Sequence, residues 1–215
     1  MSVFVCIPTA RDIHGLTTAA VFRICAGHAD GAEFKTYQAQ PTDYCRNLCV
    51  RDFLKTGHSH LLFIDSDVQP PDDCLDQMLA ANRPVVCGMY PLLLDDSNLC
   101  VSVAQRTADG EYRFLHDFPD EPFEADAAGM GCCLIRRDVF DLIEYPWFHF
   151  QQRSDCQLTG EDVYFFEQCG RAGVRPLILP RILCSHFKTV DLLEVLTAVQ
   201  QAKGPGRSSG VLTSV

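Results

Sequence analysis

The chain has 215 residues, 47% of them hydrophobic and 21% charged, which is typical of one globular domain. Its formal net charge of −10 argues against a protein that holds nucleic acid by bulk positive charge. No apolar run approaches the roughly 18 residues of a membrane span, and the opening MSVFVCIP lacks the basic start of a signal peptide. We therefore expect a cytoplasmic protein with no membrane partner.

The charge is unevenly distributed. Residues 1–150 hold 11 basic and 22 acidic side chains, whereas residues 151–215 hold 7 basic and 6 acidic ones. The acidic first part disfavours general nucleic-acid binding. The charge does not exclude a local basic face, which would be formed by Arg153, Arg171, Arg175, Arg181 and Lys188.

The twelve cysteines include no CxxC pair, and most of them lie within apolar runs. Zinc sites usually bring their ligands in closer, repeated spacings. We therefore expect reduced, buried cysteines rather than a metal centre.

The first 90 residues alternate strand-type apolar runs with helix-type patterns. Asp43 is the expected cap of the second helix, with Leu48, Phe53 and Leu54 on its inner side. This order predicts a mostly parallel sheet with helices on both faces. The expected strands are 2–7, 33–37, 61–64 and 84–88, and the expected helices are 15–26, 44–55 and a segment from just after Pro71 to about residue 81.

After residue 90 the pattern changes to a small antiparallel section. Segments 99–105 and 111–116 flank a turn at 108–110 and predict a hairpin. Further expected strands are 129–135, 174–179 and the extended piece 182–186, and further helices are 137–143, 161–172 and 190–201. We expect one α/β domain over residues 1–202 and a flexible tail over residues 203–215.

The most informative segment is Leu-Leu-Phe-Ile-Asp-Ser-Asp at residues 61–67, followed closely by two prolines. The apolar run predicts a buried strand, so Asp65 and Asp67 lie at its carboxyl end. Ligands bind at that end in open α/β sheets. Two carboxylates one residue apart suit a divalent cation that itself holds a phosphate, with a solvated turn as the alternative.

Known nucleotide motifs are missing, and the other signals are weak when taken singly. The first strand ends in Pro8-Thr9-Ala10-Arg11 without a GxGxxG pattern, and no P-loop sequence occurs. Gly129 and Gly131 allow a ligand to approach the backbone, or they mark a bulge. Glu161 and Asp162 open a helix, where they also favour its dipole. His186 and Lys188 follow the last strand, and a lone histidine is often structural.

Together these segments resemble the GT-A glycosyltransferases, most closely the small stand-alone, family 2-like type of bacteriophages. The resemblance covers about residues 1–188. Residues 1–90 would form the nucleotide-sugar half and residues 91–202 the acceptor half. It rests on IPTAR, the YCRN of residues 44–47, FIDSDVQPP, CGMYP, AAGMGCCLIRRDVF, TGEDVYFFEQCGRAG and a late histidine.

The resemblance implies a nucleotide-sugar site, with a UDP-sugar as the first candidate donor. Pro8, Thr9 and Arg11 would line the nucleoside pocket, while Arg46 and Asn47 would reach the nucleotide or the sugar. Gly129 and Gly131 would border the donor sugar, and Lys188 would reach the diphosphate. The donor residues implied are Pro8, Thr9, Arg11, Arg46, Asn47, Asp65, Gly129, Gly131 and Lys188.

The resemblance also implies a metal and a base. Asp65, Asp67 and His186 would hold Mn²⁺ or Mg²⁺ on the diphosphate. Asp162, with Glu161 beside it, would take the proton of an acceptor hydroxyl. A base opposite the leaving group implies inversion at the anomeric carbon.

The acceptor is less defined than the donor. A hydroxymethylated base in phage DNA is one candidate, and a surface glycan, a protein or a small molecule are others. A phosphatase of the haloacid-dehalogenase type, a sugar nucleotidyltransferase and a catalytically inactive nucleotide-sugar-binding module also stay open as alternatives.

Overall fold

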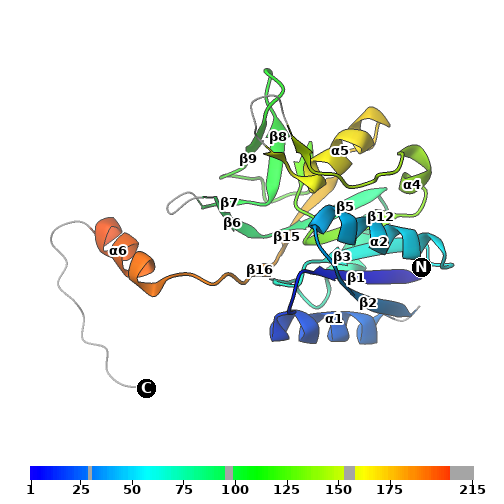
Figure 1. Cartoon of the computed structure of the whole chain (residues 1–215), viewed down its shortest axis with the longest axis horizontal. Coiled ribbons are helices and arrows are strands. Elements are labelled where there is room, and N and C mark those ends of the chain that lie inside the picture. The colour runs from blue at the N-terminus through cyan, green and yellow to red at the C-terminus, as the bar shows by residue number, and fades with distance from the viewer. Residues whose placement is uncertain (29–30, 95–98, 153–157, 204–215) are drawn as a thin grey trace.

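The computed structural model describes residues 1–28, 31–94, 99–152 and 158–203 (Figure 1). A seven-stranded sheet runs through the molecule in the order β10-β15-β5-β12-β3-β1-β2. Five of these strands point the same way, and β12 and β10 run against them, so the expected mostly parallel α/β sheet is confirmed. Its strands are β1 (Val3–Thr9), β2 (Ala32–Gln38), β3 (His60–Ile64), β5 (Val85–Met89), β10 (Phe123–Glu124), β12 (Cys132–Arg136) and β15 (Leu177–Leu183).

Helices cover both faces of this sheet. The helices are α1 (Gly15–Gly27), α2 (Thr42–Leu54), α3 (Cys74–Ala80), α4 (Val139–Leu142), α5 (Glu161–Arg171) and α6 (Leu192–Lys203). Helices α1 and α3 pack on one face, and α2, α4 and α5 pack on the other. Figure 1 shows α1 below the sheet and α2 and α5 above it, with α6 standing apart from the body.

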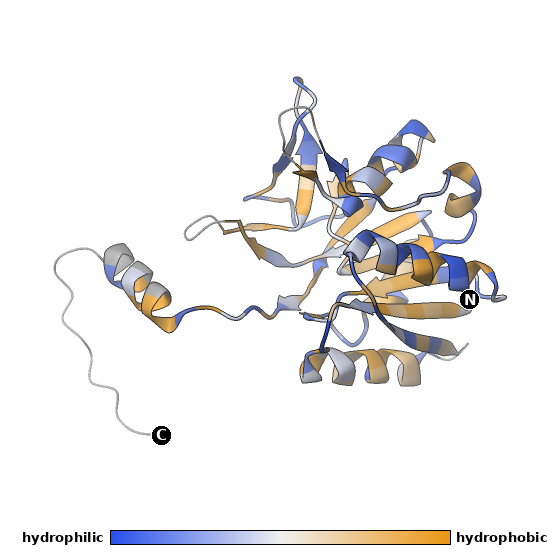
Figure 2. Ribbon diagram, viewed as in Figure 1, coloured by the Kyte–Doolittle hydropathy of each residue, from blue (hydrophilic) through white to orange (hydrophobic). Residues whose placement is uncertain are grey.

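The apolar core follows the period-two alternation of the strands. In β3, Leu61 and Phe63 join the cluster under α2, α4 and α5, whereas Leu62 and Ile64 join the cluster over α1 and α3. Every residue of β3 is buried, since both faces of a central strand are covered. Figure 2 shows the same concentration of hydrophobic residues in the central strands.

Short antiparallel pieces complete the fold at the carboxyl edge of the sheet. The expected hairpin is confirmed for β8 (Val103–Arg106) and β9 (Tyr112–Phe114), but the first part of the expected 99–105 strand is a separate strand that pairs with residues 91–93. The remaining pairs are β6 (Pro91–Leu93) with β7 (Leu99–Val101), β11 (Ala127–Ala128) with β8, β13 (Gln151–Gln152) with β14 (Leu158–Thr159), and β4 (Val68–Gln69) with β16 (Ser185–His186).

Three local expectations were wrong. Helix α2 begins at Thr42 after Pro41, so Asp43 lies in its first turn, where its carboxylate accepts hydrogen bonds from the backbone N–H groups of Tyr44 and Phe150. The expected 129–135 strand begins only at Cys132, because residues 129–131 form the turn between β11 and β12. Strand β15 runs past Pro180, which a register shift between Ile178 and Leu183 accommodates.

The cysteine expectation is confirmed for the described residues, where all eleven cysteines are free and only Cys25 is not buried. The expected tail over residues 203–215 lies outside the described part except for Lys203, which ends α6, so the tail stays a prediction. No helix among the described residues has the length and hydrophobicity required to cross a bilayer.

Arg137 ties the end of α2 to the turn before β3. Its guanidinium donates hydrogen bonds to the carbonyl oxygens of Phe53, Leu54, Thr56 and His58, and it lies 4.4 Å from the centroid of the Phe53 ring. These carbonyls lie in the last turn of α2 and in the segment after it, where helix carbonyls lack partners within the helix; the Phe53 carbonyl also accepts from Thr56.

We predict that Arg137→Met lowers the free energy of unfolding by about 2 kcal/mol or more, because charge-assisted hydrogen bonds are lost and carbonyl oxygens are left unpaired. Urea unfolding followed by circular dichroism measures the change. The matched control is Arg136→Met, since Arg136 makes only a surface pair with Asp138 at 2.7 Å and such pairs contribute about 0–1 kcal/mol. Equal losses in the two variants would contradict this role of Arg137.

Candidate functional site

A pocket of about 380 Å³ opens at the carboxyl ends of β1 and β3. Six residues implied by the resemblance lie together in its wall: Pro8, Thr9, Arg46, Asp65, Asp67 and Lys188. Ala39, Thr42 and Cys45 complete the side next to α2, where β2 ends and the helix begins. The parallel strands therefore bring three separate chain segments to one edge, as their topology requires.

The second carboxylate of the pair is held by the C-terminal segment. Asp67 Oδ2 lies 2.6 Å from Lys188 Nζ and 3.4 Å from His186 Nε2, and the Asp67 carbonyl accepts a hydrogen bond from the Phe187 N–H. Strands β4 and β16, two residues each, hold this arrangement through the pairing of His186 with Val68. Burial raises the pKa of Asp67, but hydrogen bonds from His186 and Lys188 outweigh it and lower that pKa to about 2.

The orientation of the His186 ring is set by a backbone carbonyl. Its Nδ1 lies 2.7 Å from the carbonyl oxygen of Pro91, which can only accept, so the proton is on Nδ1. Nε2 faces Asp67: with a proton it donates to that carboxylate, and without one its lone pair is available to a metal. A backbone carbonyl behind the ring is the usual partner of a metal-ligating histidine.

Asp67 and His186 fit a divalent cation as two protein ligands. Carboxylate oxygen and imidazole nitrogen suit Mn²⁺, and cations that bind phosphate are commonly held by one or two carboxylates together with substrate phosphates. No group of three His, Cys, Asp or Glu residues in the described ranges is arranged as a complete metal site. Asp65 is instead engaged by Arg46 and Asp67 by Lys188. Phosphate oxygens would have to supply the remaining ligands.

Arg46 bridges the two acidic pairs of the sequence. Its Nη2 lies 2.9 Å from Asp65 Oδ1, and its Nε lies 3.0 Å from Glu161 Oε1. The side chain is 4% exposed and packs over the Phe63 ring. Burial lowers the pKa of Arg46, but Asp65 and Glu161 together raise it above its ordinary value, so Arg46 stays charged.

Asp162 lies beside this bridge at the start of α5. Gly160 precedes the helix with an extended backbone, and one Asp162 oxygen accepts a hydrogen bond from the Val163 N–H. Burial and the neighbouring Glu161 raise the pKa of Asp162 to about 6. A carboxylate with this pKa is ionised at neutral pH and is a stronger base than an ordinary aspartate.

Tyr90 is a central residue that sequence reasoning missed. It is 5% exposed, its ring packs edge-on against His186 at 5.0 Å, and its hydroxyl accepts a hydrogen bond from the Gly131 N–H. Burial, followed by Asp65 and Asp162, raises the pKa of Tyr90 well above its ordinary value. Tyr90 belongs to the CGMYP segment, but the resemblance assigns no role to this tyrosine.

Tyr90 also explains why glycines follow β11. A Cβ atom at Gly129 would lie 2.0 Å from the Tyr90 hydroxyl oxygen, and one at Gly131 would lie 2.8 Å from its ring. Both glycines are buried under this ring. They allow Tyr90 to approach the backbone, so the space beside them is filled by protein.

Two other implied residues lie outside the wall of the pocket. Asn47 uses its amide within the protein: its Nδ2 donates to the carbonyls of Asp43 and Phe148, and its Oδ1 accepts from Trp147 and Phe148. Arg11 is exposed, and its backbone N–H binds the Thr9 hydroxyl. Asn47 therefore positions the 147–148 loop against α2.

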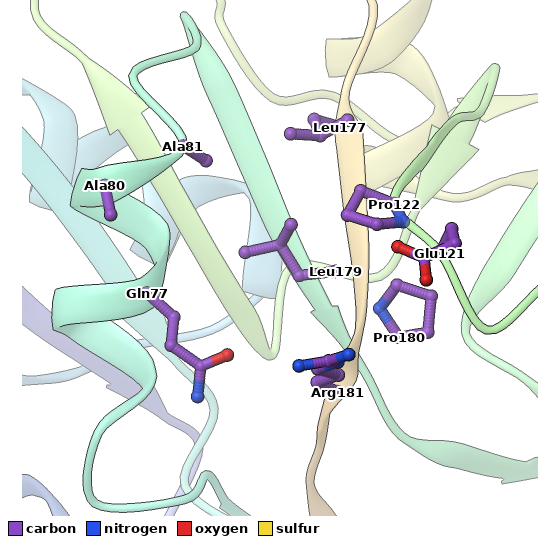
Figure 3. A pocket seen from close by; sticks show the side chains of 9 residues that line it. All are labelled: Gln77, Ala80, Ala81, Glu121, Pro122, Leu177, Leu179, Pro180 and Arg181. Carbon is purple, nitrogen blue, oxygen red and sulfur yellow. The ribbon is translucent and has the colours of Figure 1, made fainter.

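The basic residues considered for a nucleic-acid face are spread over separate pockets. Arg171 and Arg175 line one pocket, and Arg181 lines another of about 540 Å³ between α3 and β15. Figure 3 shows that second pocket, with Leu179 pointing toward α3 and with Leu177 and Arg181 on either side of it along β15. Lys188 lies at the Asp67 site, and Arg153 falls outside the described residues.

Comparisons with known proteins identify the fold. No family model and no curated protein matches the sequence. Among solved structures, A197 from STIV aligns with a TM-score of 0.60 at 21% identity over 88% of this chain and 87% of that one. GalNAc-T7, solved with UDP, GalNAc and Mn²⁺, aligns with a TM-score of 0.61 at 10% identity over 88% of this chain. The match takes in 44% of GalNAc-T7, so this chain spans less than half of that protein. The chain has a GT-A-like α/β fold.

Proposed function

We propose that this protein is a metal-dependent glycosyltransferase that moves a sugar from a nucleotide-sugar donor to an acceptor hydroxyl with inversion. The observation that carries this proposal is the Arg46 bridge, which joins the Asp65 side of the pocket to Glu161 and Asp162. One network thus contains carboxylates suited to a metal–diphosphate and a carboxylate with the pKa of a base. The likeness to GalNAc-T7, solved with UDP and Mn²⁺, supports the same reading.

In this proposal the nucleoside enters the pocket lined by Pro8 and Thr9, and the diphosphate lies toward Asp67 and Lys188. Asp67 and His186 would hold Mn²⁺ or Mg²⁺, which neutralises the charge that develops on the leaving diphosphate. Lys188 adds a second positive charge at the same place. Charges fixed before the reaction stabilise a developing anion most effectively.

Asp162 would take the proton of the acceptor hydroxyl as the new glycosidic bond forms, and the nucleoside diphosphate leaves with the electron pair of the broken bond. Tyr90, packed between His186 and Gly131, would hold the metal side and the acceptor side of the site in fixed positions relative to each other.

The acceptor proposal is a hydroxymethylated base in phage DNA, with a surface glycan, a protein or a small molecule as alternatives. A phosphatase reading is less favoured, because an aspartate nucleophile needs a free carboxylate, and both oxygens of Asp65 contact Arg46.

A donor-hydrolysis screen tests the proposal. The purified chain is incubated with UDP-, GDP- and TDP-sugars, with Mn²⁺, with Mg²⁺ or with a chelator, and released nucleotide is measured. Mass spectrometry of hydroxymethylated and unmodified DNA then tests the acceptor. Nucleotide binding without hydrolysis or transfer would favour the inactive binding module, and absence of both would overturn the proposal.

We predict that Asp67→Asn weakens Mn²⁺-dependent UDP binding by at least about tenfold, because it removes a metal-binding charge. Isothermal titration calorimetry with and without Mn²⁺ measures this. Asp72→Asn is the control, since Asp72 is an exposed acid that pairs with Arg23. Unchanged Mn²⁺ dependence in Asp67→Asn would remove Asp67 from the metal site.

His186→Ala should lower Mn²⁺ affinity and narrow the preference for Mn²⁺ over Mg²⁺, since a nitrogen ligand favours the softer ion. The measurement is the ratio of UDP affinities in the two metals, which a general loss of stability would not shift. His116→Ala, in which an exposed histidine is replaced, serves as the control. A constant ratio would identify His186 as a structural residue.

Asp162→Asn should leave UDP binding nearly intact and reduce turnover by about 10²-fold or more. Because the base works in its ionised form and its pKa is about 6, the wild-type rate should fall as pH drops through about 6. Steady-state rates across pH measure both effects, with the exposed Asp141→Asn as control. Near-normal turnover, or a product with retained anomeric configuration, would show that Asp162 is not the base.

A further inference from the structure

Arg46 serves two carboxylates from distant parts of the chain with one buried charge. Asp65 follows β3, and Glu161 opens α5, yet the guanidinium contacts both at about the same distance, 2.9 and 3.0 Å. The Glu161 side chain is 11% exposed, so little water is available to replace Arg46 there. A change in the charge or position of one carboxylate therefore changes how strongly Arg46 interacts with the other.

The hydrogen bonding of Arg46 is incomplete in this arrangement. Its Nη1 atom is buried without a hydrogen-bond partner. A buried donor without an acceptor is unfavourable, so the arrangement does not satisfy the guanidinium fully. A shift of the guanidinium between its two acids is therefore opposed by fewer fixed contacts than a fully bonded arginine would have.

We propose that Arg46 is a positioning residue that couples donor–metal binding beside Asp65 to the acidic pair Glu161–Asp162. This inference rests on the proposed function. A divalent metal held at Asp67, two residues from Asp65, would bring positive charge close to the Asp65 carboxylate, where it would compete with Arg46. Glu161 relieves that competition by drawing the guanidinium toward α5. The coupling is reciprocal, so occupancy of the donor site in turn strengthens the contact of Arg46 with Glu161, beside Asp162.

The coupling predicts that Glu161 supports donor binding without being part of the donor pocket. Glu161→Gln keeps the shape of the side chain but removes its charge. Arg46 then pairs with Asp65 alone and competes more strongly with the metal. We expect Mn²⁺·UDP to bind about fivefold more weakly or worse, the lower end of typical coupling between sites. Titration calorimetry at pH 8, above the pKa of about 6 of Asp162, measures this affinity.

Asp162→Asn is the matched control, because Asp162 and Arg46, both among the described residues, make no ion pair or hydrogen bond with each other and interact only at longer range. Its effect on Mn²⁺·UDP affinity should be smaller, less than about twofold, because Asp162 acts on Arg46 without the direct contact that Glu161 makes. In an Arg46→Met background, Glu161→Gln should have the same small effect as Asp162→Asn. This double-mutant cycle isolates the part that passes through Arg46.

Equal weakening by Glu161→Gln and Asp162→Asn would overturn the inference, as would a Glu161→Gln effect that survives in Arg46→Met. Circular dichroism checks the fold of each variant, and Arg46→Lys replaces Arg46→Met if the latter unfolds, since one ammonium group lacks the fork that spans two carboxylates. Nucleotide binding by the wild type with no Glu161 effect overturns this inference alone. Absence of nucleotide binding in the wild type overturns the proposed function as well.

Discussion

The site depends on one buried positive charge placed among carboxylates. Arg46 on α2 reaches Asp65 after β3 and Glu161 at the start of α5, so a single guanidinium joins three elements. Removing such a charge from water is costly, and only close, hydrogen-bonded partners repay that cost. The same group limits how many acids can be ionised beside it. Burial raises the pKa of Asp65 even though Arg46 opposes the rise, and burial and Glu161 raise the pKa of Asp162 to about 6.

The second positive charge comes from the opposite end of the chain. Strands β4 and β16 are only two residues long, yet their pairing carries Lys188 and His186 to Asp67. Stacking of Phe187 on His14, with ring centroids 3.8 Å apart, fixes the same segment to the start of α1. Two carboxylates one residue apart therefore face different cations, and their pKa values move in opposite directions.

The sequence predicts what depends on local pattern. The apolar runs of β1, β3 and β5 and the acidic end of β3 are local features, and they sufficed for the α/β sheet and for placing Asp65 and Asp67 at its carboxyl edge. Contacts between distant residues could not be read in this way. Arg46 and Glu161 are 115 positions apart, and nothing local distinguishes a bridging arginine from one that binds phosphate. Likewise, nothing in the sequence around Gly129 and Gly131 indicates that the Tyr90 side chain fills the space next to them.

Local charge, rather than net charge, bears on the acceptor. Arg175 pairs with Asp126 at 2.9 Å, and Arg171 lies 3.6 Å from Glu167, so these two cations are already partly neutralised by the protein. Arg181 lines a different pocket from either of them. Binding to a DNA backbone gains its strength from several cations that neutralise successive phosphates. Among the described residues Arg171, Arg175 and Arg181 do not form such a row, so these three arginines give no support to the DNA acceptor proposed above.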